Sequence, residues 1–350
     1  MSLLGEAAGE GCPSVRSAGR TGSNAGDPGD PGSQEDEDTE SLLLLSGSFI
    51  DIIIIYTALK EMTKDNHTSV SEFILLGFQG LHTFCIPLFL LLLLAYVVTI
   101  TGNSLIITLV VSTARLWSPM YFFLSHLSFC DILISTNVSP DALQVILTGL
   151  CHKSALSCHT QSYLFGSSVI TECCLLTVMS YDRYLAICDP LHYSSIMKNH
   201  LPQFLASLCW MVGFTLAMIT QVLILTLNFC GPNIVDHFFC DLAPILELAC
   251  SDTKMVEVQV SITVFLVCVS QLLFVVVTYI CIFISILQIP SISGRQKIFS
   301  TCSSHLAVVS TFYGTLITLY MAPTRGYSLN LNKALSLLNT VITPMFNPII

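Results

Sequence analysis

Long stretches without a charged residue constrain this chain more than any other feature. Residues 84–111 contain no Asp, Glu, Lys or Arg, and further long apolar stretches follow along the 350 residues. About 20 helical residues cross a hydrocarbon layer roughly 30 Å thick, so uncharged stretches of this length indicate transmembrane helices. The sequence therefore predicts an all-α membrane protein.

Composition and charge agree with this class. The chain is 53% hydrophobic and only 10% charged, whereas soluble proteins carry roughly 25% charged residues. Most of the net charge of −10 comes from residues 1–61, and the rest of the chain is nearly neutral. No basic patch suggests a nucleic-acid partner.

Residues 1–61 differ in composition from the rest of the chain. They are rich in Gly, Pro, Ser and acids and contain one short apolar run, 42–56, which Asp51 interrupts. We expect a disordered acidic extension, and the apolar run is either extra sequence upstream of the domain or an anchor or targeting element. Met62 is an alternative start. Asn66 begins an Asn-His-Thr acceptor for N-glycosylation, provided that this side is extracellular.

We predict a seven-transmembrane-helix bundle within residues 62–350. The spans lie near 84–111, 119–146, 158–188, 201–228, 257–289, 297–322 and 333–350. Basic residues in the short loops are nearly balanced between the two sides, so they decide little about orientation. The glycosylation acceptor and a cysteine-bearing loop between the fourth and fifth spans favour an extracellular N-terminus and a cytoplasmic C-terminus in the plasma membrane.

Three groups of polar residues stand out against this apolar background. Asp182 and Arg183 close the third span, where Asp182 could neutralise Arg183 until a partner offers a better contact; the alternative is a basic anchor at the membrane surface. A second group consists of acids within spans, Asp131 and Glu172. With Asn103 and Asn347 they predict a buried polar cluster able to hold a cation, unless they face water or a loop.

The third group is cysteine. Four of the fifteen Cys residues lie at helix ends or in a polar loop, namely Cys158, Cys230, Cys240 and Cys250. Four Cys allow three pairings, and the sequence does not choose among them. A zinc site with His237 is the alternative, but there is no Cys-x-x-Cys pair, and oxidising surroundings favour disulfides. The chain has no zinc-protease, phosphate-loop or serine-hydrolase motif, so we expect no enzyme activity and no cofactor beyond the cation.

Several ordered motifs carry a resemblance to a known family. They are Glu-Phe-Ile-Leu-Leu-Gly-Phe at 72–78, Gly-Asn at 102–103, Pro-Met-Tyr-Phe-Phe-Leu at 119–124, Met-Ser-Tyr-Asp-Arg-Tyr-Leu-Ala-Ile-Cys at 179–188, Pro-Leu-His-Tyr at 190–193, Phe-Ser-Thr-Cys-Ser-Ser-His-Leu at 299–306, Phe-Tyr-Gly at 312–314 and Pro-Met-Phe-Asn-Pro at 344–348. In order and spacing, over nearly all of residues 62–350, the chain resembles the odorant (olfactory) receptors of tetrapod type (class II), which belong to the rhodopsin-like G-protein-coupled receptors.

The resemblance implies a rhodopsin-like fold and assigns roles to individual residues. It implies the disulfides Cys158–Cys240 and Cys230–Cys250. It also implies that G-protein coupling and activation involve Asp182, Arg183, Tyr184, Tyr279, Lys297, His305, Tyr313, Asn347 and Pro348. The implied partner is a heterotrimeric stimulatory G protein that raises cyclic AMP.

Ligand-facing positions follow from the same resemblance. They fall on Phe165, Gly166, Val169, Ile170, Thr263, Leu316 and Tyr320. The first four lie on one helical face by their spacing, although ordinary helix packing would explain any one of them. No residue among them is a strong counter-charge, so we expect small, volatile, mainly apolar ligands that are neutral or weakly polar.

Departures from the family pattern define the rival hypotheses. Trp117, Ser118 and Asn339 replace residues usual in the family, and the sequence stops at Ile350, before the expected end of helix 7 and the cytoplasmic tail helix. A non-signalling receptor product is therefore the main alternative. A transporter or channel is the rival from another class, but no internal repeat supports it.

Overall fold

The computed structural model describes residues 70–77, 84–197, 200–230, 232–288, 290–321 and 329–348. The chain divides into two units, Met1–Asp65 and Asn66–Ile350, and every described residue lies in the second. The predictions made for residues 1–61 and for the glycosylation acceptor Asn66 fall outside the described residues.

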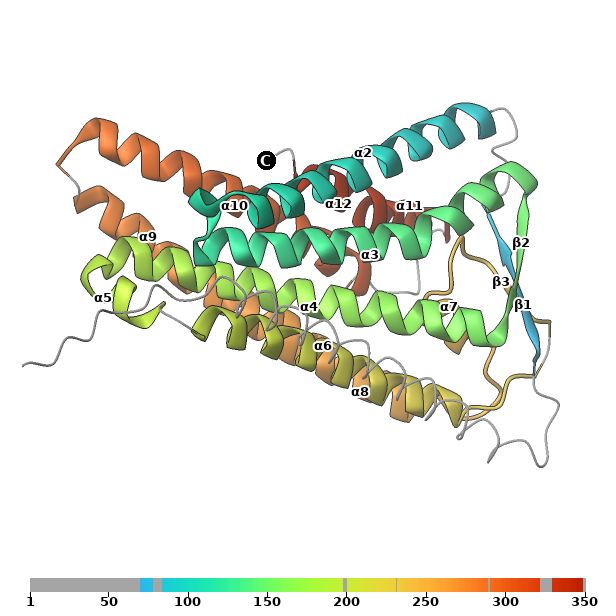
Figure 1. The fold of residues 1–350 in the computed structure, drawn as a ribbon. Coiled ribbons are helices and arrows are strands. Elements are labelled where there is room, and N and C mark those ends of the chain that lie inside the picture. Colours follow the sequence, from blue (N-terminus) through green and yellow to red (C-terminus); the bar gives the residue numbers. More distant parts are fainter. Residues whose placement is uncertain are drawn as a thin grey trace, which may run out of the picture. The chain divides into compact units, whose positions relative to one another are not determined.

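Seven helical rods run side by side in the described part of the second unit (Figure 1). They are α2 (Cys85–Ser112), α3 (Pro119–Thr148), α4 (Ala155–Cys188), α6 (Leu201–Leu225), the continuous run of α8 (Lys254–Val264), η2 (Phe265–Val269) and α9 (Ser270–Gln288), then α10 (Ile292–Met321), and finally α11 (Leu329–Leu337), η3 (Leu338–Ile342) and α12 (Thr343–Phe346). Each rod covers one predicted span. A 3-10 turn, η1 (Ala114–Leu116), joins α2 to α3.

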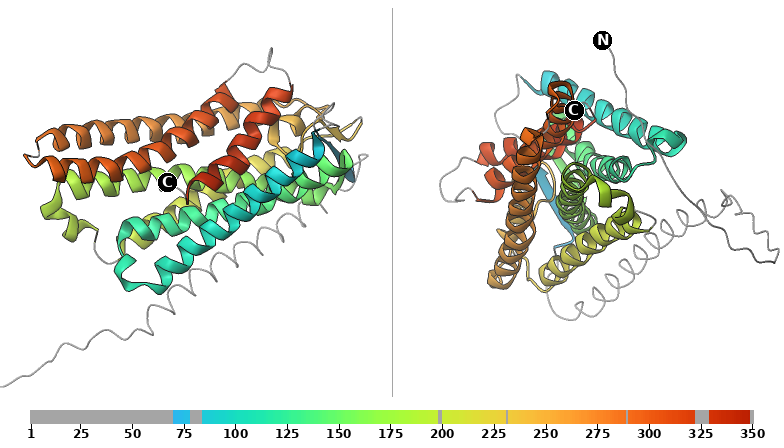
Figure 2. Two further views of the ribbon diagram at one scale, coloured as in Figure 1. Left: turned by 90° about the horizontal axis from the view of Figure 1, so that it is seen from above. Right: turned by 90° about the vertical axis from the view of Figure 1, so that its left-hand side faces the viewer.

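The rods differ in how much of their surface the protein covers. Four described helices are long and apolar enough to cross a membrane by length and composition: α2, α4, α6 and the α8–α9 run. In the most apolar stretch of α4, 72% of the residues are buried, against 17% for α2 and 11% for the α8–α9 run. α4 is thus the central rod, packed against α3, α6 and α9 (Figure 2). The apolar faces of α2 and α9 remain for lipid.

Close packing of α4 against α6 depends on a residue without a side chain. A Cβ atom added at Gly213 would lie 2.6 Å from the carbonyl oxygen of Ser167 and would also overlap the hydroxyl of Thr171. Small residues let helix backbones approach closely where packing, not the hydrophobic effect, drives association in lipid. Gly213 therefore fixes the distance between these two rods.

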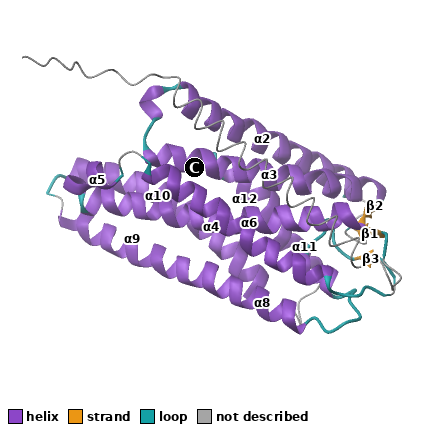
Figure 3. Ribbon diagram, turned by 60° about the horizontal axis from the view of Figure 1, so that its bottom comes forward, coloured by secondary structure: helices purple, strands orange, loops and turns teal. Residues whose placement is uncertain are grey.

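A small sheet covers one end of the bundle (Figure 3). Strand β1 (Glu72–Leu76) pairs antiparallel with β2 (Leu150–Ser154) and parallel with β3 (Ile234–Val235). The side chains of Phe73 and Leu75 alternate with more exposed ones and are fully buried, the pattern of a strand with one covered face. This strand was not predicted, because residues 72–76 lie before the first apolar span and their pairing partners are far away in the sequence.

We call this end of the bundle the sheet end. The opposite end, which we call the Arg183 end, carries the last turns of α4 and the short helix α5 (Pro190–Ile196). At the sheet end, the loop between α6 and α8 contains β3 and one further short helix, α7 (Leu242–Leu246). This loop supplies part of the candidate site.

Replacement of Gly213 by Ala is expected to lower the free energy of unfolding by about 1–3 kcal/mol, because the added methyl group has no room against Ser167 and Thr171. The melting temperature of the purified chain in detergent measures this change. The control is Gly166→Ala, whose Cβ atom would meet only Ala217 at 3.9 Å. Equal melting temperatures for the two variants would contradict the close approach of α4 and α6.

Candidate functional site

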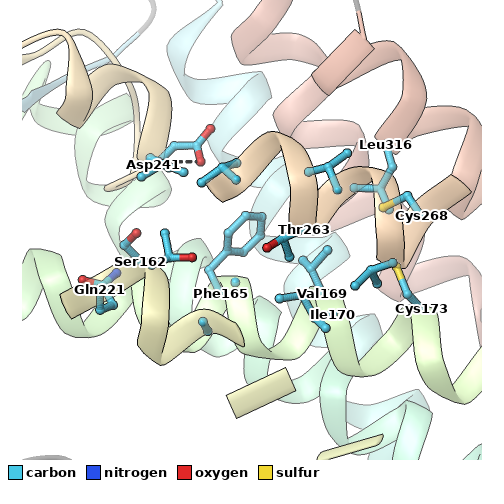
Figure 4. Close-up of a pocket in the computed structure, with 17 residues that line it drawn as sticks. Ser162, Phe165, Val169, Ile170, Cys173, Gln221, Asp241, Thr263, Cys268 and Leu316 are labelled. Carbon is cyan, nitrogen blue, oxygen red and sulfur yellow. Dashed lines mark hydrogen bonds between the residues drawn. The ribbon is translucent and has the colours of Figure 1, made fainter. Parts of the chain in front are cut away.

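A cavity lies between α4, α6, the α8–η2 segment and α10, under the α6–α8 loop (Figure 4). The cavity and its open mouth together contain about 790 Å³ of space. Six of the seven predicted ligand-facing residues line it: Phe165, Gly166, Val169, Ile170, Thr263 and Leu316. The seventh, Tyr320, belongs to α10, but its side chain lies outside the described residues.

The lining also contains residues that the sequence analysis did not select. Ser162 and Gln221 contribute polar groups from α4 and α6, and Asp241 contributes a carboxylate from the loop. Cys173 and Cys268 lie at the other end of the cavity (Figure 4). Cys268 belongs to η2, a π-helical turn of the kind often found at functional sites. Ser162 and Cys173 lie on the same face of α4 as Phe165, so helical spacing from Phe165 would have predicted both of them as lining residues.

Asp241 changes the electrostatics expected for this cavity. Its side chain is buried, and its Oδ1 accepts a hydrogen bond from the backbone N–H of Leu242 at 2.8 Å. Burial raises the pKa of Asp241 to about 6, so the carboxyl group is still mostly ionised at neutral pH. None of the predicted ligand-facing residues is charged, but Asp241, which was not among them, adds a charge to the lining. The predicted positions all lie on helices, whereas a loop residue supplies this charge.

Two attachments hold this loop over the cavity. Cys158, on the first turn of α4, forms a disulfide with Cys240, directly before Asp241, with Cα atoms 5.4 Å apart. Gln161 accepts a hydrogen bond from the backbone N–H of Cys240 at 2.9 Å and donates one to Asp141 on α3 at 2.6 Å. The loop is thus fixed to α4 by a covalent bond and by a buried amide side chain.

Two further contacts fasten the rest of the loop. A second disulfide joins Cys230 to Cys250, with Cα atoms 5.8 Å apart. Lys333, at the start of the last rod, is buried and donates to Asp236 at 2.6 Å and to the carbonyl oxygen of Gly77 at 3.1 Å. The sheet end is therefore cross-linked from the segment before α2 to the last rod.

His237 lies in the same loop and was the histidine of the alternative zinc site. Burial, and then the nearby Lys333, lower its pKa to about 3, so the imidazole is neutral. The cysteine sulfurs closest in sequence are oxidised as disulfides. Within the described ranges, no group of three or more His, Cys, Asp or Glu side chains could hold a metal ion.

Three of the four predicted polar-cluster residues meet in the middle of the bundle. Asn347 donates to both carboxylate oxygens of Asp131 at 2.9 Å, and Glu172 lies beside Asp131. Both acids are buried, and Glu172 Oε1 has no hydrogen-bond partner among the described residues. Asn103 instead donates to the carbonyl oxygens of Thr99 and Pro344. It joins α2 to the last rod, and the described residues show no hydrogen bond between Asn103 and either acid.

At the Arg183 end, Asp182 has a hydrogen-bond partner that was not predicted. The hydroxyl group of Tyr193, on α5, donates to Asp182 at 2.9 Å. No ion pair within 4.0 Å joins Asp182 to Arg183 in the described part of the chain. Arg183 is still near enough to interact electrostatically with Asp182, so the predicted neutralisation of Arg183 by Asp182 stays a prediction.

Arg183 also has neighbours on two other rods. It lies near enough to Tyr279, Cys302 and His305, on α9 and α10, to interact with them electrostatically. The hydroxyl group of Tyr279 shares a hydrogen bond of 2.5 Å with His305 Nδ1, and their rings stack. A contact between α9 and α10 thus lies beside the arginine.

The remaining residues assigned to activation are spread over this half of the bundle. Tyr184 packs on a cluster that contains Ile282 and Cys302. The hydroxyl group of Tyr313 lies 3.5 Å from the carbonyl oxygen of Cys173. Pro348 lies where a Cβ atom on Gly102 would meet it at 3.0 Å. Lys297 belongs to α10, and its side chain is outside the described residues.

Comparison with known proteins gives one consistent result. A family model described as olfactory receptor matches residues 41–350. The chain is 45% identical over 288 residues to human Olfactory receptor 6X1, covering 81% of this chain and 91% of that protein. It is 45% identical over 289 residues to human Olfactory receptor 6F1, covering 83% and 94%. It is 42% identical over 289 residues to mouse Olfactory receptor 5P52, covering 83% and 93%.

Replacement of Gln161 by Ala is expected to loosen the loop above the cavity. The change removes the acceptor for the N–H of Cys240 and the donor to Asp141, which costs about 1–3 kcal/mol for buried groups left unpaired. Hydrogen–deuterium exchange of the peptide around Cys240 should accelerate, and the melting temperature should fall. Thr160→Ala, at an exposed neighbouring position on α4, is the control. Unchanged exchange at Cys240 would show that the disulfide alone holds the loop.

Proposed function

The chain belongs to the olfactory receptor family, and from this membership we propose that it binds small, volatile, mainly apolar odorants in the cavity beside α4 and then activates a heterotrimeric stimulatory G protein that raises cyclic AMP. As a member of this family it is a membrane-embedded, multi-pass G-protein-coupled receptor and not an enzyme. The observation that carries the proposal is the cavity itself, which six predicted ligand-facing residues line.

The lining of the cavity supports an odorant as the ligand. Most lining side chains are apolar, among them Phe165, Val169, Ile170 and Leu316. A small molecule with an apolar body would bury most of its surface there, and a few polar groups would orient it. Odorants match this description in size and polarity.

We propose that the sheet end is extracellular and that the Arg183 end is cytoplasmic, in the plasma membrane. Both disulfides lie at the sheet end, and disulfides persist in oxidising, extracellular surroundings. Asn66, the glycosylation acceptor, shortly precedes β1 in the sequence, and β1 belongs to the sheet end. A G protein would then reach Asp182 and Arg183 from the cytoplasm.

The helix α10 offers a physical route from the ligand to the G protein. It contributes Leu316 to the cavity and His305 to the contact with Tyr279 beside Arg183. Eleven helical residues span about 16 Å, so one rigid helix joins both places. A ligand that binds better to one position of α10 shifts the population toward it by its differential affinity. That shift would change the contacts near Arg183.

The buried acids Asp131 and Glu172 form a further part of the proposal. A cation could bind between Asp131 and Glu172, where Glu172 Oε1 is buried without a hydrogen-bond partner in the described chain. Ionisable groups inside a membrane protein are costly and commonly functional. A bound cation would stabilise whichever arrangement of the rods keeps the two acids together.

The proposal is tested by cyclic AMP in cells that display the chain at their surface. A panel of odorants should raise cyclic AMP, and Arg183→Ala should abolish the response at equal surface staining, because it removes the cation that the G protein would contact. Arg115→Ala, at the same end in η1, is the control. A chain that reaches the surface and never responds would favour the non-signalling alternative, and ion flux without a G protein would favour a channel.

Replacement of Tyr193 by Phe is expected to raise basal cyclic AMP about fivefold per surface receptor. The change removes the hydrogen bond to Asp182, and a loss of about 1 kcal/mol in the resting arrangement changes the active population by roughly that factor. Tyr121→Phe, an exposed ring on α3 at the same end, is the matched control. Basal signalling equal to the unmodified chain would show that this hydrogen bond does not favour the resting state.

A further inference from the structure

The cavity has one polar end and one apolar end. Ser162, Gln221 and Asp241 lie at the end beneath the loop, whereas Val169, Leu316 and the two thiols lie at the other (Figure 4). Along α4, Ser162 and Cys173 are eleven residues apart, about 16 Å. A ligand that satisfies both ends must therefore carry one polar head on an apolar body.

The polar end presents hydrogen-bond acceptors that the protein itself leaves under-used. Gln221 is buried, and its Oε1 has no hydrogen-bond partner among the described residues. The carboxylate of Asp241 accepts from the N–H of Leu242, and no Lys, Arg or His nitrogen of the described chain lies within 4.0 Å of it. Buried acceptors without partners cost free energy, and a buried unpaired charge costs more.

From this arrangement we infer that the cavity prefers ligands with a primary ammonium head on a hydrocarbon body, with the head between Asp241 and Gln221. The inference rests on the proposed function, since it names a ligand class for the same cavity. Asp241 is the one charged residue among the described residues that line the cavity. An ammonium group offsets that charge, and the hydrocarbon body occupies the apolar end.

Donor counting favours an ammonium group over the other common head groups. An alcohol brings a single O–H, so it leaves either Gln221 Oε1 or the carboxylate without a donor. An ether or ester brings none, and a carboxylate adds a second negative charge beside Asp241. A primary ammonium group brings three N–H donors, enough for the carboxylate, for the Gln221 amide oxygen and for the hydroxyl of Ser162. Hydrogen bonds that involve two charged groups are also the stronger ones.

Asp241 has a purely structural role as well, and the test must separate the two. Its side chain caps the first residue of α7, and Asn caps a helix about as well as Asp. Asp241→Asn therefore keeps the cap and removes the charge. Asp252→Asn removes an exposed acid from the same loop and is the matched control. Gln221→Leu removes the second acceptor and leaves the charge.

The experiment measures ligand-induced stabilisation of the purified full chain in lipid nanodiscs at neutral pH. The probes are primary n-alkylamines from butyl to octyl, each beside the alcohol, methyl ether and carboxylic acid of the same chain length. We expect at least one amine to raise the melting temperature and to bind more tightly than its matched neutral probes. Its affinity should fall about 10- to 100-fold in Asp241→Asn, less in Gln221→Leu, and not in Asp252→Asn.

Three outcomes would overturn the inference: no amine of the series stabilises the chain, the matched alcohols bind as well as the amines, or Asp241→Asn binds the amines unchanged. The melting temperature of each variant without a probe shows that it is folded. Cyclic AMP in cells, measured with the same probes and a broad odorant panel, separates this inference from the proposed function. Amine binding that depends on Asp241 without cyclic AMP would refute signalling alone, and signalling by neutral odorants without amine binding would refute the amine preference alone.

Discussion

The arrangement of this bundle depends on one constraint: polar groups of a buried helix in a membrane must find partners inside the protein. α4 is the rod that carries most of them, and it is also the most covered. Lipid cannot satisfy a buried amide or acid. The neighbours of α4 therefore supply the partners. Asp141 on α3 accepts a hydrogen bond from Gln161, and Tyr193 on α5 donates one to Asp182. The central position of α4 follows from its polarity.

The same constraint connects the sheet end to the cavity. The disulfide from Cys158 and the hydrogen bond to Gln161 hold two consecutive features of one loop, the side chain and the backbone of Cys240. With Cys240 fixed, the next residue, Asp241, has little freedom to point elsewhere. Loops are commonly mobile, but these two attachments fix the position of the Asp241 carboxylate relative to α4.

The extent to which the sequence predicts this molecule varies with the range of the interactions. Spans such as α2 follow from uncharged stretches alone, because hydrophobic length is a local property. Six cavity residues were predicted because helical spacing and the family resemblance place them on known faces. Asp241 and Gln221 were missed, since the first depends on how a long loop folds back and the second on the approach of α6 to α4. The Tyr193–Asp182 contact was missed for the same reason: it needs the position of α5 relative to α4.

The way charges are satisfied gives Asp241 a distinct place among the buried ionisable groups. Lys333 is fully buried, yet it has Asp236 and a backbone carbonyl as acceptors. Asp131 has both amide hydrogen bonds from Asn347. Both groups form their hydrogen bonds with other residues of the protein, and these bonds stabilise contacts between separate segments of the chain. Asp241 uses one backbone N–H and leaves much of its carboxylate to the cavity. Glu172 also keeps one carboxylate oxygen without a partner in the described chain, but it does not line the cavity. Asp241 does line it, and this is where we place the ammonium head of a ligand.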